Sequence, residues 1–330
     1  MLGIQGLPHF PHFVLLILAL GACPWAAPTQ AQSAYPDRPI RLIVPWPPGG
    51  ASDGLARIIT PKLAESMGQP WVIENHPGAS GNIGAEIAAR SRSDGYTVLI
   101  VLDTSITANP HLYKMFNVQR DLKPVMTLAS IDHVLVTNPN VPASSGAQFI
   151  ALARQKPHTL NFASAGVGSS NHLAVELIKR RGDVDIVHVA YKGGGPATMS
   201  VVSGETQLMM SSVASTNQLI KQGRLVPLAT PGATRYRSLP DVPTLAESGF
   251  PGFEIVFWHG LLVPSGTPAA IVDRLNAELT RVLALPDVQA AMATLGLTPM
   301  PSTAADFEAR IARESATWAK LIKESDIRAE

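Results

Sequence analysis

Charged residues and cysteine are both scarce in this chain. Only 15% of the 330 residues are Asp, Glu, Lys or Arg, and the formal net charge is +1. Lysine and arginine are scattered rather than clustered, so the electrostatic footprint of a nucleic-acid-binding protein is missing, and DNA and RNA are excluded as partners. The 46% hydrophobic content over this length is sufficient to bury the cores of about two domains.

Acidic and basic residues are absent from the first 33 positions, and the first charged side chain is Asp37. This region contains the apolar run FVLLILALGA, followed by APTQAQSAYP. The run is shorter than the ~20 apolar residues of a membrane-spanning helix, and the pattern is typical of an export signal. We therefore expect a signal peptide over residues 1–33, cleavage near Ala31 or Ser33, and a periplasmic location.

Cys23 is the only cysteine, and it ends the segment LGAC. This segment is similar to the site at which bacterial lipoproteins are cleaved and acylated. A lipid anchor at Cys23 and a chance cysteine in a removed leader both stay open. In either case the chain after the leader has no disulfide, so its stability must come from its core.

Strand and helix patterns alternate along the rest of the chain. The runs IRLIV, PWVIEN and YTVLIV are separated by helical patterns, which is βαβαβ order, and the same rhythm returns after HVLVTNP. The sequence therefore predicts an α/β fold with two domains, each built around a mainly parallel sheet. The segment FEIVFWHGLLVP is a candidate return strand, followed by three helices that we expect to pack on the first domain, at 268–284, 286–295 and 304–323.

Four glycine-rich turns each follow a strand pattern and lead into a helical pattern. The free amides at a helix start attract anions, and ligands of open α/β sheets lie beyond the carboxyl ends of the strands. We therefore expect turns from the two domains to line one cleft that suits a small carboxylate. The four turns are PWPPGGASDGLAR (45–57), ENHPGASGNIGAE (74–86), FASAGVGSSNHLA (162–174) and YKGGGPATM (191–199).

The first of these turns allows a local prediction. Gly49 and Gly50 permit unusual backbone dihedrals, and Ser52 or Asp53 is suited to cap the helix that follows.

The segment GASGNIG, followed about 20 residues later by Asp103, partly matches a dinucleotide-binding fingerprint. Its glycine spacing differs from G-x-G-x-x-G, and a reduced nicotinamide is hard to supply outside the cytoplasm. An oxidoreductase is therefore only a minor alternative, and no cofactor is expected.

No G-x-S-x-G nucleophile elbow occurs in the sequence. Folding can still bring Ser169, His172 and an Asp together, which leaves an exported hydrolase open, although capping of a helix by Ser169 and Ser170 is the more ordinary interpretation.

His172 and Glu176 lie at i, i+4, but no third metal ligand is evident nearby. We predict that the protein is not an enzyme and binds no metal.

Several segments taken together closely resemble the Bug/TctC family of extracytoplasmic solute receptors, the binding proteins of tripartite tricarboxylate transporters. The likeness covers nearly the whole chain after the leader, in order. The segments are YPDRPIRLIVPWPPGGASDGLAR, GQPWVIENHPGASGNIGAE, DGYTVLI, NFASAGVGSSNHLAVEL, DIVHVAYKGGGPA, LPDVPTLAESGFPGFE and GLLVPSGTPAAIVDRLNAEL.

The resemblance implies a two-lobed periplasmic binding protein fold of type II, whose lobes are joined by crossing strands and close over a ligand. Lobe 1 would contain residues 34–132 and 258–330, and lobe 2 residues 133–257. The ligand would be a small organic acid, held largely by backbone amides and ordered waters. The partners would be the membrane subunits of a tripartite transporter, and the protein would be a monomer.

Residues of the ligand site follow by position from the same resemblance, with Ser211 added because it stands at a position where relatives have an acid. His172 and Tyr191 are open to a second interpretation as core residues. The first wall is Trp46, Pro47, Gly50, Ser52, Asp53, Asn82, Asp103, Thr104 and Ser105, and the second wall is Ser164, Ala165, Gly168, Ser169, Ser170, His172, Tyr191, Gly193 and Gly194.

Departures from the family pattern bear on specificity. The segment QLMMSS replaces the usual DLMFDS, so Ser211 cannot pair with an amino group, which disfavours amino-acid ligands. Asp103 stands where a small residue is common, and we expect it to narrow the pocket or to repel a second carboxylate. Alternatives are an aromatic acid stacked on Trp46, Tyr191 or Trp258, and a sensor that passes occupancy to a signalling protein.

Overall fold

The structure is a computed structural model and describes residues 35–113 and 118–329. Residues 35–330 form one compact unit that contains both sheets of the protein. The predicted signal peptide, its cleavage site and Cys23 lie outside the described residues.

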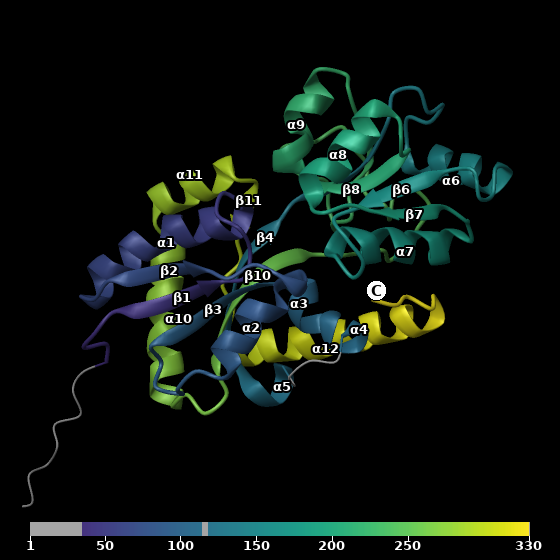
Figure 1. The fold of residues 1–330 in the computed structure, drawn as a ribbon. Coiled ribbons are helices and arrows are strands. Elements are labelled where there is room, and N and C mark those ends of the chain that lie inside the picture. Colours follow the sequence, from purple (N-terminus) through teal and green to yellow (C-terminus); the bar gives the residue numbers. More distant parts are fainter. Residues whose placement is uncertain (1–34, 114–117, 330) are drawn as a thin grey trace, which may run out of the picture. The chain divides into compact units, whose positions relative to one another are not determined.

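The first sheet has six strands in the order β11-β4-β10-β3-β1-β2 (Figure 1). In β1, every residue except Arg41 is buried. Leu42 packs in one cluster with Leu55 of α1, whereas Ile43 packs in another with Ala85 of α2, so helices cover both faces. The strands are β1 (Ile40–Val44), β2 (Trp71–Asn75), β3 (Thr97–Leu102), β4 (Leu122–Ile131), β10 (Phe257–Pro264) and β11 (Leu297–Pro299).

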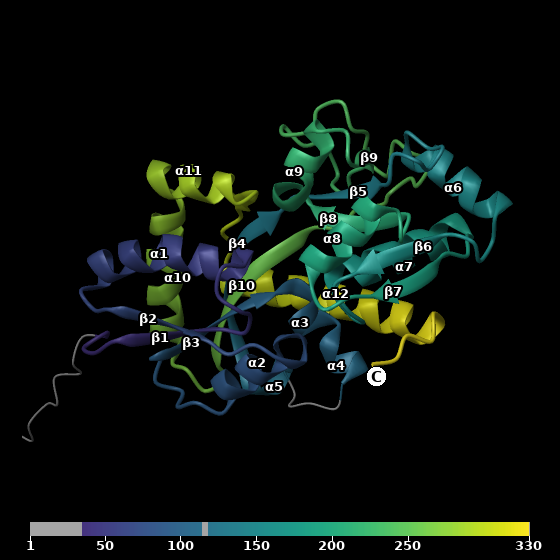
Figure 2. The same cartoon turned by 45° about the horizontal axis from the view of Figure 1, so that its top comes forward.

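The helices of this first lobe include the three from the end of the chain. Both α10 and α12 pack on β4, and α11 packs on α1 and β11, which confirms the predicted return to the first domain. Figures 1 and 2 show α12 continuing from this lobe toward α7. The helices are α1 (Ala51–Met67), η1 (Ala79–Gly81), α2 (Asn82–Ala89), α3 (Asp103–Thr107), α4 (Asn109–Leu112), α5 (Val118–Asp121), α10 (Ala269–Leu283), α11 (Pro286–Thr294) and α12 (Ala304–Glu324).

The second sheet has five strands in the order β7-β6-β8-β5-β9. Its strands are β5 (His133–Thr137), β6 (Asn161–Ser164), β7 (Val187–Ala190), β8 (Leu208–Ser212) and β9 (Val226–Ala229). Its helices are α6 (Gly146–Gln155), α7 (Ser170–Gly182), α8 (Gly194–Ser203) and α9 (Val213–Lys221). The predicted α/β class with two lobes is therefore confirmed, whereas the residue limits predicted for the lobes stay a prediction.

The prediction that the sheets are mainly parallel is wrong, because both are mixed. β10 runs antiparallel to β3 and β4, and β5 runs antiparallel to β8 and β9. β5 and β10 are the strands at which the chain arrives from the other sheet. Such a strand begins at the junction of the lobes, where the neighbouring strands end, so it must run in the opposite direction.

The two connections between the sheets lie side by side. Only Asp132 separates β4 from β5, and Ile131 pairs with Phe257 at the start of β10. The His133 ring stacks on the Phe257 ring with centroids 3.8 Å apart. The two sheets are therefore joined by two adjacent crossings of the chain.

Among the helices that the structure describes, none combines the length and the apolar character needed to cross a membrane.

Candidate functional site

The lobes meet at the start of α7 in the second lobe, which contacts the start of α3 in the first lobe. We call this contact between the lobes the seam. The Ser170 hydroxyl group donates a hydrogen bond to Asp103 Oδ1 at 2.6 Å and lies 3.1 Å from Thr104 Oγ1. Asp103 and Thr104 open α3 in the first lobe, and both are buried. The contact therefore joins helix starts from the two sheets, at the carboxyl ends of β3 and β6.

The turn before α1 is held by its own carboxylate. Gly49 has φ +88°, as expected for glycine, but Gly50 has an ordinary φ of −80° and is the N-cap residue. Asp53 is not a cap. Its carboxylate accepts from the Gly49 amide at 2.9 Å, from Arg57 Nε at 2.8 Å and from Asn75 Nδ2 at 3.1 Å. The hydrogen bond from Arg57 lowers the pKa of Asp53, so this buried carboxylate fixes the turn and is not left to bind a ligand.

Replacing Asp53 by alanine is expected to loosen this turn. The change removes four hydrogen bonds to a charged group, two of them from Arg57, and we expect the free energy of unfolding to fall by about 2 kcal/mol, with faster exchange of the Gly49 amide. Arg57→Ala is the matched control, because the Arg57 side chain is 58% exposed and its loss leaves the Gly49 bond in place. Denaturant unfolding and amide exchange measure both effects; equal losses in the two variants would contradict this role of Asp53.

Ser52 is also not a cap, and instead pairs with a histidine from the crossing strand β10. Ser52 Oγ lies 2.9 Å from His259 Nε2, and both residues are buried. Burial lowers the pKa of His259 to about 3, so its ring is neutral. Its Nδ1 is buried and has no hydrogen-bond partner among the described residues. The start of α1 is thus tied to the strand that lies next to β3 and Asp103.

The loop before α2 is braced by asparagines. Asn109 Nδ2 donates to Asn82 Oδ1 at 2.8 Å and to the Ser80 carbonyl at 3.0 Å. The Trp46 ring covers Gly81, where a Cβ atom would lie 3.2 Å from the ring. Asn82 and Trp46 therefore both contact this loop, and their role in binding a ligand stays a prediction.

The turn before α7 uses several of its own amides internally. The Ala165 amide donates to Asn171 Oδ1 at 3.2 Å, and the Gly168 amide donates to His172 Nδ1 at 3.1 Å. The Ser169 hydroxyl group lies 2.6 Å from Asn171 Oδ1, and Ser169 is the N-cap residue without a side-chain cap bond. Ser169 and His172 thus have different partners and do not form a nucleophile–base pair.

The His172 ring stacks with the rings of His188 and Phe162. Its centroid lies 3.9 Å from that of His188 and 5.9 Å from that of Phe162. Burial lowers the pKa of His172 to about 3, and His188 Nε2 bonds the Ser164 hydroxyl group at 2.6 Å. His172 Nε2 is 3.9 Å from Glu176 Oε1. In the described part of the chain, no three His, Cys, Asp or Glu side chains gather as metal ligands.

The start of α8 is open. Gly193 has φ +109°, and Cβ atoms built at Gly193 and Gly194 would meet nothing within 4 Å. The Tyr191 hydroxyl group is buried without a hydrogen-bond partner among the residues that the structure describes. Ser211, in contrast, is buried behind this helix, 3.3 Å from Thr198 Oγ1. Within the described part of the chain, the Ser211 hydroxyl group bonds only inside its own lobe.

Sequence reasoning missed several side chains that shape these turns. His259 is the single titratable residue in the otherwise apolar run FWHGLLVP, and such a lone residue in a strand pattern is a signal that can be seen in the sequence. Asn171 stands in the first turn of a helix, where such side chains often bond the preceding loop. Asn109 and His188 have no comparable signal, because their partners are distant in sequence.

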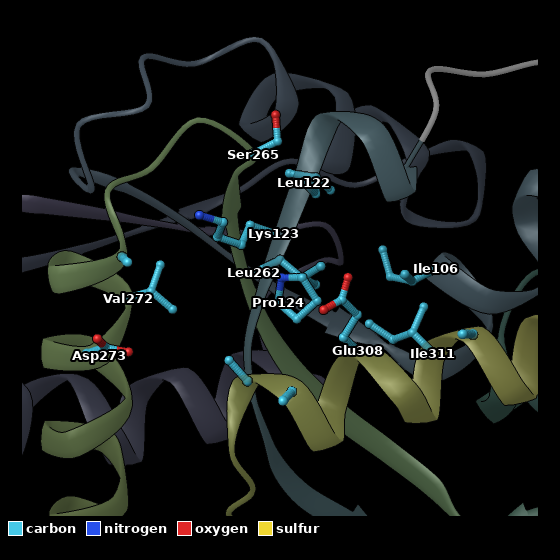
Figure 3. A pocket seen from close by; sticks show the side chains of 14 residues that line it. Ile106, Leu122, Lys123, Pro124, Leu262, Ser265, Val272, Asp273, Glu308 and Ile311 are labelled. Carbon is cyan, nitrogen blue, oxygen red and sulfur yellow. The ribbon is translucent and has the colours of Figure 1, made fainter.

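A separate pocket of about 610 Å³ lies within the first lobe, between α10 and α12. Figure 3 shows Glu308 of α12 beside Pro124 of β4 on its wall. The wall is mostly apolar, and its charged side chains are Lys123, Asp273 and Glu308. It contains none of the predicted site residues.

Comparison with known proteins places the chain in a family. The model of the TctC family, described as the tripartite tricarboxylate transporter family receptor, matches residues 55–327. A UPF0065 protein from the tcbD-tcbE intergenic region of Pseudomonas sp. (strain P51) is 40% identical over 321 residues, which cover 94% of this chain and 93% of that protein. Protein BugT of Bordetella pertussis is 35% identical over 305 residues, covering 91% and 93%.

Solved structures agree with this placement. An R. palustris protein with adipate has a TM-score of 0.80 at 33% identity and covers 89% of this chain and 99% of its own. MatC from Rhodopseudomonas palustris with bound malate has a TM-score of 0.76 at 30% identity and covers 87% and 100%. The family consists of receptors, and further similar structures are a periplasmic binding protein, BugD, and a TctC solute-binding protein from Polaromonas, which confirms the prediction that the protein is not an enzyme. The chain therefore belongs to the TctC family of periplasmic solute-binding receptors.

Proposed function

We propose that this receptor captures a small organic acid between its lobes and delivers it to the membrane subunits of a tripartite transporter. The observation that carries the proposal is the meeting of α7 with α3 at Ser170 and Asp103, with the start of α1 tied to the adjacent strand through Ser52 and His259. Turns from two lobes thus face one seam.

The chemistry of these turns suits an anion. The first-turn amides of a helix have no acceptor within the helix, and the helix dipole favours negative charge there. α1, α7 and α8 each present such a start at the predicted walls. Two relatives were solved with adipate and malate, which are carboxylic acids. A carboxylate held by these amides is therefore the ligand that the site supports best.

The residues predicted to form the two walls of the site have different roles in this proposal. Asp53 positions the first turn and Ser211 lies behind α8, whereas the buried hydroxyl group of Tyr191 and His259 Nδ1 are polar atoms for a ligand or its waters to bond. Trp258 does not serve the aromatic-acid alternative. It is fully buried, its ring meets Phe307 edge to face at 5.1 Å, and its Nε1 donates to Glu314.

Thermal unfolding against a panel of mono-, di- and tricarboxylates, amino acids and aromatic acids tests the proposal. A ligand present at 100 times its dissociation constant is expected to stabilise the folded protein by ~2.7 kcal/mol, which raises Tm by roughly 4 °C for a chain of this size. At least one carboxylate is expected to produce this shift and to be recovered unchanged. A panel in which no acid shifts the melt, or in which an ester is consumed, would overturn the proposal.

A further inference from the structure

Asp103 is an acidic group at the seam itself. It is 2% exposed, and both of its hydrogen bonds end on Oδ1, from Ser170 Oγ at 2.6 Å and from the Thr104 amide at 2.7 Å. Oδ2 is therefore the oxygen on which a proton can reside. A carboxyl group protonated there donates a hydrogen bond, whereas an ionised one can only accept.

The groups that face Asp103 do not compensate a negative charge. Glu314 of α12 acts on Asp103 through its negative charge, and its own bonds go to Trp258 and Arg310. The charge of Arg313 in the same helix acts on Glu314. No described lysine or arginine pairs with Asp103. Burial lowers the pKa of the histidines on the elements packed nearby, which disfavours a positive charge there: His111 of α4, His172 of α7 and His259 of β10.

Closing the lobes thus changes the acidity of Asp103. Burial, and secondarily Glu314, raises the pKa of Asp103 to about 7 in this structure, despite the opposing bond from Ser170. With the lobes apart, water reaches the carboxyl group and its pKa returns toward the ordinary value of 3.8. The closed form binds the proton more tightly than the open form, and a second negative charge brought by an organic acid strengthens this preference.

We propose that Asp103 couples ligand capture to proton uptake: the lobes close over the organic anion with the Asp103 carboxyl group neutral and bonded across the seam to Ser170. The proposal rests on the proposed function for its ligand, but the closure of the lobes can be tested without one. Asp103 would then also determine which ligand charge the site accepts. An ionised Asp103 repels a carboxylate, whereas a neutral Asp103 can form a hydrogen bond with it.

The sign of the pH dependence follows from linkage. Because the pKa is higher in the closed form, closure is favoured fully below the open-form pKa near 4 and is lost as pH rises through about 7. Between pH 5.5 and 8.5 we expect the ratio of closed to open molecules to fall roughly 30-fold. The buried histidines predict the opposite sign, because their pKa values are lowered on burial and acid would open the lobes.

Distance measurements between two spin labels test this coupling in the ligand-free protein. Cys23→Ser removes the only native thiol, and Val72→Cys in the first lobe and Met199→Cys in the second provide label sites that are 45% and 50% exposed. We expect the short-distance population to decrease from pH 5.5 to 8.5. In Asp103→Asn, which keeps the Oδ1 acceptor and cannot ionise, the population is expected to stay constant.

Glu314→Gln is the matched control, because it removes the neighbouring acid and keeps an acceptor for Trp258. It is expected to retain the pH dependence with a lower midpoint, since Glu314 raises the pKa of Asp103. The same pH dependence in wild type and Asp103→Asn, or none in wild type, would overturn the coupling.

Calorimetric titration with an acid, in buffers of different ionisation enthalpy, then measures proton uptake on binding. Adipate and malate are the first probes. We expect about 0.5 proton per ligand at pH 7 and nearly one at pH 6, against none in Asp103→Asn. Binding of an acid without proton uptake would contradict the coupling but not the receptor function. A pH-dependent distance between the spin labels in a protein that binds no acid would contradict the proposed ligand class but not the role of Asp103 in closure.

Discussion

Replacing Gly168 by leucine is expected to hold the lobes apart and to weaken ligand binding at least 10-fold. Gly168 belongs to the turn before α7, and a Cβ atom there would lie 2.5 Å from Leu112 Cδ1 of α4, in the other lobe. A larger side chain therefore acts as a wedge at the seam. Calorimetric titration with the best acid of the panel measures the loss of affinity.

The controls separate the wedge from backbone strain. Gly168 has φ +79° and Gly223 has φ +67°, a region that costs a leucine about 1–2 kcal/mol. A Cβ at Gly223 meets nothing within 4 Å, so Gly223→Leu introduces the strain without the clash. Adding Leu112→Ala to Gly168→Leu is expected to restore part of the affinity. Similar binding by the Gly168→Leu and Gly223→Leu variants would contradict closure at this contact.

Replacing Gly260 by alanine is expected to destabilise the fold by about 3 kcal/mol. Gly260 lies in β10, and its Cβ would stand 2.2 Å from the tip of the Phe307 ring, which is fully buried. That ring is held edge to face against Trp258, so it cannot turn away freely. Denaturant unfolding measures the loss as a lower midpoint.

A double-mutant cycle identifies the cause of this loss. Phe307→Leu alone opens a cavity and destabilises the protein, but in combination with Gly260→Ala it removes the clash. We expect the double variant to be more stable than the sum of the two single effects implies, by at least 1 kcal/mol. Strict additivity would show that the packing of β10 on α12 does not depend on this glycine.

Local periodicity predicts the elements of this fold well. In α10, the buried residues Val272, Leu275, Leu279 and Val282 recur at helical spacing. The direction of β10 was not predictable, because a strand's pattern is the same in either direction and its pairing depends on where the chain enters the sheet. The sheets are therefore mixed although the local patterns suggested parallel ones.

For the candidate site, the sequence indicates the turns but not the bonds within and between them. Asp53 follows a glycine turn and was expected to cap or to line the site, yet its carboxylate is used by Gly49 and Arg57. Asp103 stands out in the sequence as a departure from the family pattern. Its bond to Ser170 joins residues 67 positions apart, and no local pattern encodes a contact of that range.

The most direct test of the receptor assignment is calorimetric titration of the protein with the best carboxylic acid of the panel and with its methyl ester. The walls proposed here bind a carboxylate through helix-start amides, so we expect saturable, one-to-one binding of the acid, recovery of the acid unchanged, and no measurable binding of the ester. Equal affinity for the acid and the ester, or hydrolysis of the ester, would contradict an anion receptor.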